Sequence, residues 1–285
     1  MGRWLIVLGS ALSATTPVFR HLLGDGAGWS SAQIAGARGL FGFLALALVV
    51  RTKIFVPRQL LAPVAIVAAA FTIGTGLFLY AYENAPAGVV ITIVNVSPIW
   101  VALYERFFGE KRRQPLLWVA LVFGLGGTLL MTKDADWSKR ASVLPILAAF
   151  ADSFVYAACV LSNRRIAQTK ISPFIPAFWG LGLLTATFGW TCFSAHWTPV
   201  ALLESMSMGL VSSAAAFTFV ILGMRYARSA TEVSLLLYTE IVFVWLYFSL
   251  GFGEPIRWHH LAGVSAIVAS SLLASWPARK MPNPS

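Results

Sequence analysis

Long runs of apolar residues, separated by short stretches rich in charge, proline or glycine, extend through the whole chain. A helix that crosses a bilayer needs about 20 mostly apolar residues, and the runs between polar interruptions give ten segments of that length. We expect membrane-spanning helices at about residues 2 to 23, 31 to 51, 59 to 83, 86 to 108, 114 to 132, 142 to 167, 173 to 193, 198 to 226, 228 to 252 and 257 to 277.

These runs do not alternate between apolar and polar residues as the strands of a membrane barrel do. Backbone polar groups inside a bilayer must bond within the protein, which favours helices. Of the 285 residues, 58% are hydrophobic and 11% are charged, against roughly 45 to 50% and about 25% in soluble domains. The sequence therefore predicts an all-α membrane protein with ten transmembrane helices and no separate soluble domain.

Positive charges are distributed unevenly between the two sides of the predicted bundle. With the N-terminus in the cytoplasm, fifteen of the 21 Lys and Arg residues fall on the cytoplasmic side, five fall on the opposite side, and Arg38 lies within the second span. Cytoplasmic loops are enriched in Lys and Arg. This pattern predicts a multi-pass protein of a bacterial-type inner membrane with both termini cytoplasmic. It also accounts for the net charge of +10 without a nucleic-acid partner.

Motifs for cofactors and metals are missing from the sequence. Cys159 and Cys192 lie in apolar segments without the spacing of a metal site, which favours buried free thiols. The glycines form neither a P-loop nor a dinucleotide fingerprint, and there is no HExxH or GxSxG motif. We expect no cofactor and no metal. The expected partners are a small-molecule substrate and membrane lipid, with no nucleic acid and no obligate protein partner.

An internal duplication relates the two halves of the chain. The stretch 85–90, leading through Pro98 to Phe108-Gly109-Glu110, resembles the stretch 227–232, leading to Phe252-Gly253-Glu254, with an offset of 142 at the start and 144 at the end. Each half, 2–132 and 142–277, holds five predicted spans, and an odd number turns the second half upside down. Inverted repeats of this kind surround a midplane cavity and are typical of carriers. The polar stretch 133–140 is expected to be the solvated linker.

These features resemble the drug/metabolite transporter superfamily, in particular its EamA-type members with two repeats of five spans. The resemblance covers nearly the whole chain. It is carried by Arg38 and by the small-residue turns at 85–88 and 227–230, each followed by an apolar span with a Gly-Glu ending. Within the superfamily the chain is most similar to a YddG-type aromatic amino acid exporter. It departs from the family in one respect, because the offset of 142 places Glu240 opposite the mid-span proline Pro98.

Charged residues inside the spans are the first candidates for a transport site, because a charge near the bilayer centre costs about 2.5 to 3.5 kcal/mol or more and usually faces a cavity or a partner. Glu240, beside Tyr238 and Thr239, could bind a substrate ammonium group, accept a proton, or be a paired structural carboxyl. Arg38 is expected to lock helices together. The four charges expected near the centre are Arg38, Asp152, Glu232 and Glu240.

Polar and aromatic residues complete the predicted site. Pro98 denies the carbonyl of Val94 its helical hydrogen bond, and a freed carbonyl could bind an ammonium group, although a kink needed only for packing is the alternative. Aromatic rings could stack on a ring-bearing substrate or simply fill the core, and small hydroxyls often serve helix packing. The predicted substrate-binding residues are Thr16, Tyr80, Tyr82, Asn95, Pro98, Trp100, Tyr156, Phe217, Tyr238 and Glu240.

The inverted repeat and the lack of a catalytic motif favour a transporter that exports small metabolites, including aromatic amino acids, by alternating access around the midplane cavity. The alternative is a membrane-embedded enzyme acting on lipid or acyl substrates through Asp152, Glu240 and one of His259 and His260. These histidines begin the tenth span, far from a midplane carboxyl, which disfavours a shared site. A channel or a non-transporting scaffold is also compatible with the spans alone.

Overall fold

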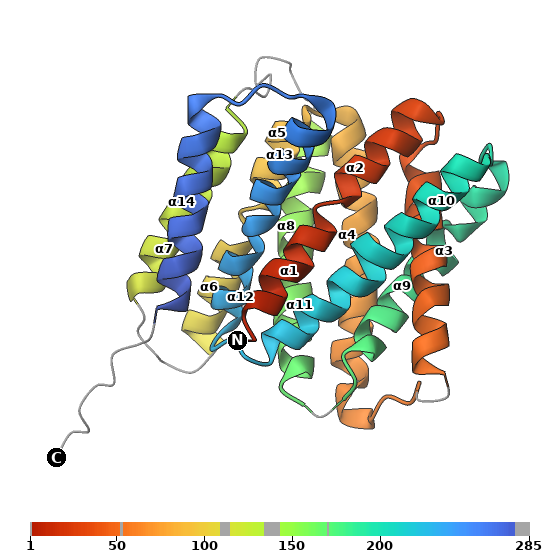
Figure 1. Ribbon diagram of the computed structural model, residues 1–285. Coiled ribbons are helices and arrows are strands. Elements are labelled where there is room, and N and C mark those ends of the chain that lie inside the picture. The colour runs from red at the N-terminus through yellow and green to blue at the C-terminus, as the bar shows by residue number, and fades with distance from the viewer. Residues whose placement is uncertain (1, 52–53, 109–114, 134–142, 170, 277–285) are drawn as a thin grey trace.

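The computed structural model describes residues 2–51, 54–108, 115–133, 143–169 and 171–276, and every regular element within these ranges is a helix. Figure 1 shows the helices standing side by side, with consecutive segments running alternately up and down. This arrangement confirms the predicted all-helical class. In the first half the helices are α1 (Trp4–Ser13), α2 (Thr16–His21), η1 (Leu22–Gly26), α3 (Ser31–Val50), η2 (Arg58–Leu60), α4 (Leu61–Asn84), α5 (Ala87–Val94), α6 (Ser97–Phe108) and α7 (Pro115–Met131).

The second half also contains both continuous and broken helices, but in another order, since it begins with the continuous α8 and its third segment is divided by η4. Of the elements labelled η in the two halves, η1 and η4 are π-helices, and η2 and η3 are short 3₁₀ helices. The helices of this half are α8 (Val143–Ala167), α9 (Phe174–Phe188), η3 (Gly189–Ser194), α10 (Pro199–Ser207), η4 (Met208–Ala215), α11 (Ala216–Met224), α12 (Ala230–Leu237), α13 (Thr239–Phe252) and α14 (Trp258–Ser275).

Seven segments of the described chain are long and apolar enough to cross a membrane. The remaining predicted spans correspond to α7, α9 and α14, of 17, 15 and 18 residues. Their membrane crossing remains a prediction. The seven segments are Trp4–Gly26, Ser31–Val50, Arg58–Asn84, Gly88–Phe108, Val143–Ala167, Pro199–Met224 and Ala230–Phe252.

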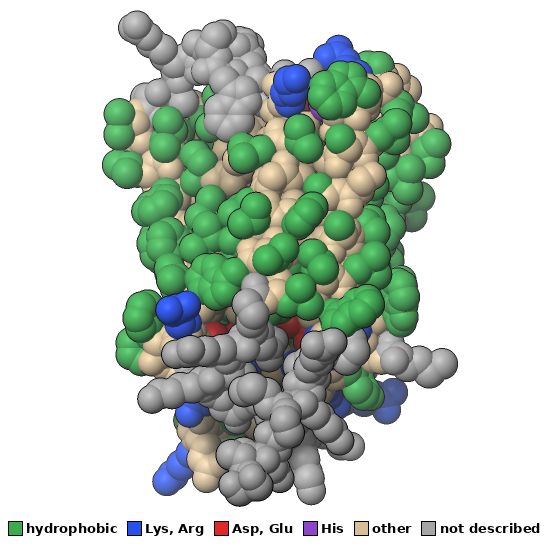
Figure 2. Space-filling view, turned by 90° about the vertical axis from the view of Figure 1, so that its left-hand side faces the viewer, with side chains coloured by type: hydrophobic (Ala, Val, Ile, Leu, Met, Phe, Trp, Pro, Cys, Tyr) green, Lys and Arg blue, Asp and Glu red, His purple; other side chains and the backbone are tan. Residues whose placement is uncertain are grey.

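The outer surface matches a membrane environment. On the face shown in Figure 2, a broad band of hydrophobic side chains crosses the middle of the molecule, with Lys and Arg toward its two ends. Leu48, Phe123, Phe193 and Leu272 are examples of large apolar side chains that are more than two-fifths exposed. A soluble protein rarely exposes a contiguous apolar surface of this extent. The chain is therefore a multi-pass helical membrane protein.

Helix breaks divide several segments that the sequence predicts as continuous spans. The first is interrupted at Ala14–Thr15, the fourth at Asn95–Val96 and the ninth at Tyr238, while the eighth passes through the π-helical η4. Proline explains two of the breaks, because Pro17 and Pro98 each occupy the second position of the helix that follows, where a missing N–H is tolerated. Each of these four segments is still long and apolar enough as a whole to cross a membrane.

Packing between the halves holds the bundle together. The principal helix pairs are α1 with α11, α4 with α8, α3 with α9, and α7 with α14. Glycines bring the last pair close, because a Cβ on Gly127 would lie 2.9 Å from the carbonyl oxygen of Gly263, and one on Gly263 would lie 2.9 Å from that of Gly127. Small residues permit such close backbone contact between membrane helices.

Several features of the sequence fall outside the described residues. The linker predicted at 133–140 lies outside them from Asp134 onward, and so does the Gly109–Glu110 ending of the fourth span. The same holds for some of the cations used to predict orientation, namely Lys53, Lys111, Arg112, Arg113, Lys139, Arg140, Lys170, Arg279 and Lys280.

Candidate functional site

Glu240 meets the first span at the level of its break. Ser13, the last residue of α1, donates a hydrogen bond from Oγ to Oε1 of Glu240 at 2.8 Å. Glu240 is the second residue of α13 and lies near the middle of the segment Ala230–Phe252. The first turn of a helix favours a carboxylate because its backbone N–H groups carry partial positive charge. The break thus gives a mid-membrane carboxylate both a donor and a favourable helix end.

Arg38 connects the second span to the π-helical part of the eighth. Its Nε donates to Oγ of Ser213 at 2.7 Å, and its guanidinium carbon lies 5.4 Å from the centre of the Phe71 ring. Arg38 and Glu240 attract each other electrostatically, although no direct ion pair joins them. The expectation that Arg38 bridges helices agrees with these contacts, and its opposite charge partly offsets that of Glu240.

A second hydroxyl contact lies at the break of the first span. The Oγ1 of Thr15 and the Oγ of Ser212 are 2.6 Å apart, and Ser212 belongs to η4. Thr16, one of the predicted binding residues, has a buried Oγ1 with no hydrogen-bond partner in the described part of the chain. Buried polar groups are normally paired, so the unpaired hydroxyl of Thr16 is available to a ligand or to water.

The breaks of the fourth and ninth spans contact each other. Tyr238, only 1% exposed, donates from its hydroxyl to the carbonyl oxygen of Asn95 at 2.7 Å. The side chain of Asn95 instead donates to the carbonyl of Ile91 at 2.8 Å. Pro98 is buried in the first turn of α6. Of these predicted residues, Tyr238 and Pro98 are packed inside the protein, so they shape the site more than they line it.

Trp100 and Tyr156 extend the cluster toward α8. Trp100 donates from Nε1 to Oγ of Ser153 at 3.0 Å and stacks on Phe154 with ring centres 4.1 Å apart. Tyr156, which exposes 37% of its surface, lies within electrostatic range of both Asp152 and Glu240. These contacts bring Trp100, Tyr156 and Glu240 into one neighbourhood across α6, α8 and α13.

Asp152 is a second mid-span carboxyl. It is 5% exposed and faces α4, where a Cβ on Gly74 would lie 2.8 Å from its Oδ1. Glycine at position 74 is therefore what leaves room for this carboxyl between α4 and α8. A buried carboxyl is expensive unless it is protonated or paired, which makes Asp152 a candidate proton carrier.

The remaining predicted binding residues lie apart from one another. Phe217 packs at the junction of three apolar clusters, edge-on to Phe71 with ring centres 4.9 Å apart. Tyr80 is 40% exposed on α4, and its side chain makes no hydrogen bond to another described residue. Tyr82 lies under the guanidinium of Arg20, whose carbon is 4.0 Å from the ring centre. Only Phe217 of these three adjoins the central cluster, through Phe71.

Glu232 was expected near the bilayer centre, and this expectation is wrong. It occupies the first turn of α12, at one end of the segment, and is 1% exposed. Arg3 Nε lies 2.6 Å and Arg228 Nε 3.3 Å from its two carboxylate oxygens. A polar residue at the entry to a helix, followed three positions later by a carboxylate, is a capping signature, and Ser229 indeed caps this helix.

Further contacts make this end of the bundle a continuous polar network. Glu105 of α6 accepts hydrogen bonds from the backbone of Ala230 and Thr231, at 2.6 and 2.9 Å, and from the Thr231 hydroxyl. Arg164 of α8 donates to the carbonyls of Met224 and Ala227, at 2.7 and 2.5 Å. We call Arg3, Glu105, Arg164, Arg228 and Glu232 the end network. It ties α1, α6, α8, α11 and α12 together.

The opposite end of the helix bundle contains a pocket. A polar pocket of about 280 Å³ lies between α2, η1, α3, α4 and α13, and its lining includes Arg20, His21, Asp25, Tyr82 and Glu83. We call it the end pocket. It is on the other side of the helix breaks from the end network, because α1 runs from Arg3 toward α2 and α4 runs toward Tyr82 (Figure 1). The two ends of the bundle therefore differ in chemistry and in packing.

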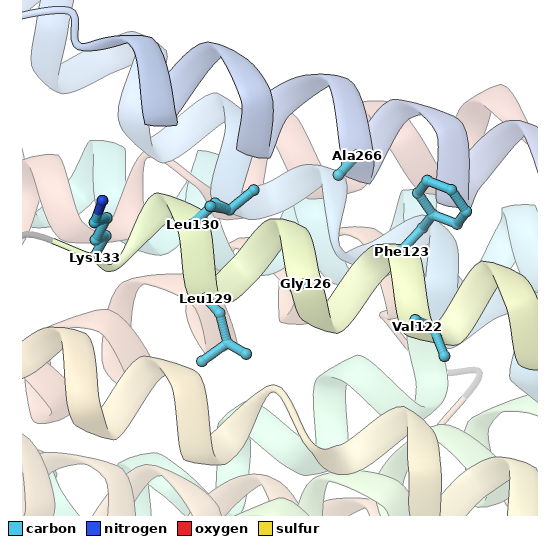
Figure 3. A pocket seen from close by; sticks show the side chains of 7 residues that line it. All are labelled: Val122, Phe123, Gly126, Leu129, Leu130, Lys133 and Ala266. Atoms are coloured by element: carbon cyan, nitrogen blue, oxygen red, sulfur yellow. The ribbon is translucent and has the colours of Figure 1, made fainter.

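A groove of about 390 Å³ lies on the outside of the helix pair α7 and α14. Figure 3 shows that most of its labelled residues lie on α7, with Lys133 just after the end of that helix and Ala266 on α14. The lining is apolar apart from Lys133, so the groove lacks the convergent polar groups of a solute site. Its composition suits lipid contact. The lining residues are Val122, Phe123, Gly126, Leu129, Leu130, Lys133 and Ala266.

Of the residues considered for an enzymatic site, the two histidines lie away from the mid-span carboxyl groups. Asp152 faces Gly74 on α4, Glu240 meets Ser13 on α1, and His259 and His260 begin α14. Within the described ranges no group of three or more His, Cys, Asp or Glu side chains could hold a metal ion.

Some residues of the site were not among those predicted. The central hydrogen bonds of the site are made by Ser13, Ser212 and Ser213. Arg20 lines the end pocket. Serines in membrane helices are too common to single out by sequence. Arg20 had a usable signal, because it is one of the few cations on the side that the charge pattern leaves poor in Lys and Arg.

Comparison with known proteins gives a family match for the first part of the chain. Residues 1–133 match the EamA-like transporter family, which supports membership of the drug/metabolite transporter superfamily. A search of curated proteins found no significant match. A solved structure titled "Crystal structure of protein" has the same fold, with a TM-score of 0.80 and 16% identity over 96% of this chain and 97% of that one. The family match and the apolar helices together support a multi-pass membrane transporter.

Proposed function

We propose, with the family match of residues 1–133 as the premise, that the whole chain is an EamA-type transporter of two five-span repeats, 2–132 and 142–277, inverted relative to each other. The helix pairs support this proposal. In the proposed repeat the third span corresponds to the eighth and the sixth to the first. The contact of α4 with α8, which are the third and sixth spans, therefore has its counterpart in the contact of α11 with α1. The pairs α3 with α9 and α7 with α14 join equivalent spans and are unchanged by the exchange.

The helix breaks support the same symmetry. Pro98 and Glu240, which the offset of 142 aligns, are each the second residue of the helix after a break, in α6 and α13. Discontinuous helices near the midplane expose helix ends and carbonyls to a substrate, as in many carriers built from repeats. In this chain one repeat fills the position with a helix-breaking proline and the other with a carboxylate.

The proposed activity is export of small metabolites, including aromatic amino acids, by alternating access. One observation carries it: a polar cluster at the helix breaks, containing Glu240, Ser13, Arg38 and Ser213, lies between an end sealed by ionic contacts and an end that is hollowed. The opposite charges of Glu240 and Arg38 suit a zwitterion. The aromatic rings of Trp100 and Tyr156 nearby suit an apolar or aromatic side chain.

Charge distribution supports the orientation, with both termini cytoplasmic in a bacterial-type inner membrane. At the end of the bundle that holds the end network, helix termini and turns carry Arg3, Arg51, Arg58, Arg106, Arg164, Arg165, Arg225 and Arg228 (Figure 1). Among described residues the opposite end carries Arg20, Lys133 and Arg257. The positive-inside rule makes the sealed end cytoplasmic. The structure then corresponds to a state closed toward the cytoplasm, with the end pocket facing outward.

Counterflow in proteoliposomes tests the proposal. Vesicles preloaded with unlabelled L-tryptophan should take up labelled L-tryptophan or L-phenylalanine faster than empty vesicles, with a transient overshoot that protein-free liposomes lack. A channel gives no overshoot, and an enzyme gives no uptake. Absence of counterflow for these amino acids and for a broad panel of other small metabolites would contradict the transport function.

A further inference from the structure

The end pocket has the position of a site for a small solute and a volume close to that of such sites. Its volume of about 280 Å³ falls just below the roughly 300 to 1,000 Å³ typical of small-molecule sites. It is formed by segments far apart in the sequence, with Arg20 from α2, Ser31 from α3, Tyr82 from α4 and Phe248 from α13. Movement of the first or ninth span would change its shape.

Arg20 is held rigidly at this pocket but is not neutralised. The Tyr82 ring supports its guanidinium at 4.0 Å, and Nη2 donates to Oγ of Ser31 at 3.2 Å. The Nε atom is buried without a hydrogen-bond partner. No carboxylate among the described residues forms an ion pair with Arg20, in contrast to Arg3 and Arg228 at the other end. An arginine fork fixed by an aromatic ring is suited to a planar carboxylate.

The two acidic residues of the pocket differ in availability. Asp25 lies 2.5 Å from His21, between its Oδ2 and Nδ1. Glu83 is exposed and makes no ion pair with another described residue. The pocket therefore offers one unpaired cation, Arg20, and one unpaired anion, Glu83. Phe248 supplies an apolar wall.

We infer that the end pocket is a second, outward-facing binding site for zwitterionic amino acids, in which Arg20 binds the carboxylate, Glu83 binds the ammonium group and Phe248 contacts the side chain. This inference rests on the proposed transport function. It adds a second binding site on the path of the substrate, separate from the central cluster at Glu240. Because Arg20 is stacked on Tyr82 before a ligand arrives, little side-chain entropy is lost on binding.

Cysteine protection gives a local test in the full chain. Gly24 lines the pocket, and a Cβ there would make only ordinary contacts, with nearest atoms at 3.8 Å. Gly251 on α13 does not line this pocket, and a Cβ there would meet nothing within 4 Å. The variants Gly24→Cys and Gly251→Cys, in proteoliposomes, are treated with a membrane-impermeant maleimide. The native Cys159 and Cys192 are buried.

L-Phenylalanine should slow labelling of Gly24→Cys at least threefold without affecting Gly251→Cys. Phenethylamine, which lacks the carboxylate, should not protect. Addition of Arg20→Gln should abolish protection, Arg20→Lys should leave part of it, and Lys133→Gln, which changes another cation at the same end, should leave it intact. Protection should persist with Glu240→Gln, because the central cluster is a separate site.

The inference is overturned if L-phenylalanine does not protect, if phenethylamine protects equally, or if protection survives Arg20→Gln. These outcomes are distinct from failure of the transport function. Counterflow with no protection rejects the outer site alone, whereas Arg20-dependent protection without counterflow of any metabolite keeps the site and rejects the transporter.

Discussion

The hydroxyl of Tyr238 donates a hydrogen bond to the backbone carbonyl of Asn95 at 2.7 Å, and each residue stands at the break of its own segment. The two residues are 143 positions apart, within the offset range of 142 to 144 that relates the two halves. The contact therefore ties the broken part of one proposed repeat to the corresponding part of the other. It also satisfies a carbonyl that the interrupted helix leaves near the middle of the bundle.

Tyr238→Phe should destabilise the protein by about 1 kcal/mol, because it removes one buried donor and leaves the Asn95 carbonyl unpaired. The expected result is a lower midpoint of thermal unfolding in detergent. Tyr104→Phe is the matched control, because Tyr104 is 50% exposed and its hydroxyl makes no hydrogen bond within the described chain. Equal midpoints for the two variants would show that the Tyr238 contact contributes nothing measurable.

Glu232→Gln should weaken the end network. Loss of a buried ion pair by removal of one partner costs about 3 to 5 kcal/mol, and the effect here should be smaller because Arg3 and Arg228 are partly exposed. We expect a lower unfolding midpoint and faster thiol labelling of Ser234→Cys, since Ser234 is 3% exposed behind this network. Glu254→Gln, an exposed acid at the other end, is the control and should change neither measurement.

Glu240→Gln should reduce counterflow of amino acids at least tenfold, because the amide lacks the charge that faces an ammonium group but can still accept the Ser13 hydrogen bond. If flux is proton-linked, the variant should also lose its dependence on an imposed pH gradient. Initial rates across a pH series measure both effects, with Glu254→Gln again as the control. An unchanged rate and pH profile would remove Glu240 from the mechanism.

Arg38 and Glu240 should be energetically coupled through their mutual attraction. Each single variant, Arg38→Gln or Glu240→Gln, leaves one charge uncompensated in the bundle, so the double variant should be more stable than the sum of the single effects predicts. Coupling between neighbouring residues amounts to about 0.5 to 3 kcal/mol. Unfolding midpoints of the four proteins measure it, and simple additivity would mean that the two charges act independently.

The sequence by itself determined the membrane character and the position of the helices, because apolar runs long enough for a bilayer force the backbone to bond within each segment. It also indicated Arg38, Asp152 and Glu240 as charges within the spans, since few charges interrupt these runs. These features are local in the chain, and a local pattern is sufficient to predict them.

Tertiary structure alone decided which charges share a neighbourhood and which are ordinary structural pairs. Glu232 and Glu240 look alike in sequence, yet one joins Arg3 and Arg228 at the end of the bundle and the other meets Ser13 in the middle. The sequence analysis only counted Arg20 among the cations opposite the cytoplasm, and the fold places it on Tyr82 beside a pocket. Such pairings join residues up to 229 positions apart, and they depend on how helices pack rather than on any pattern along the chain.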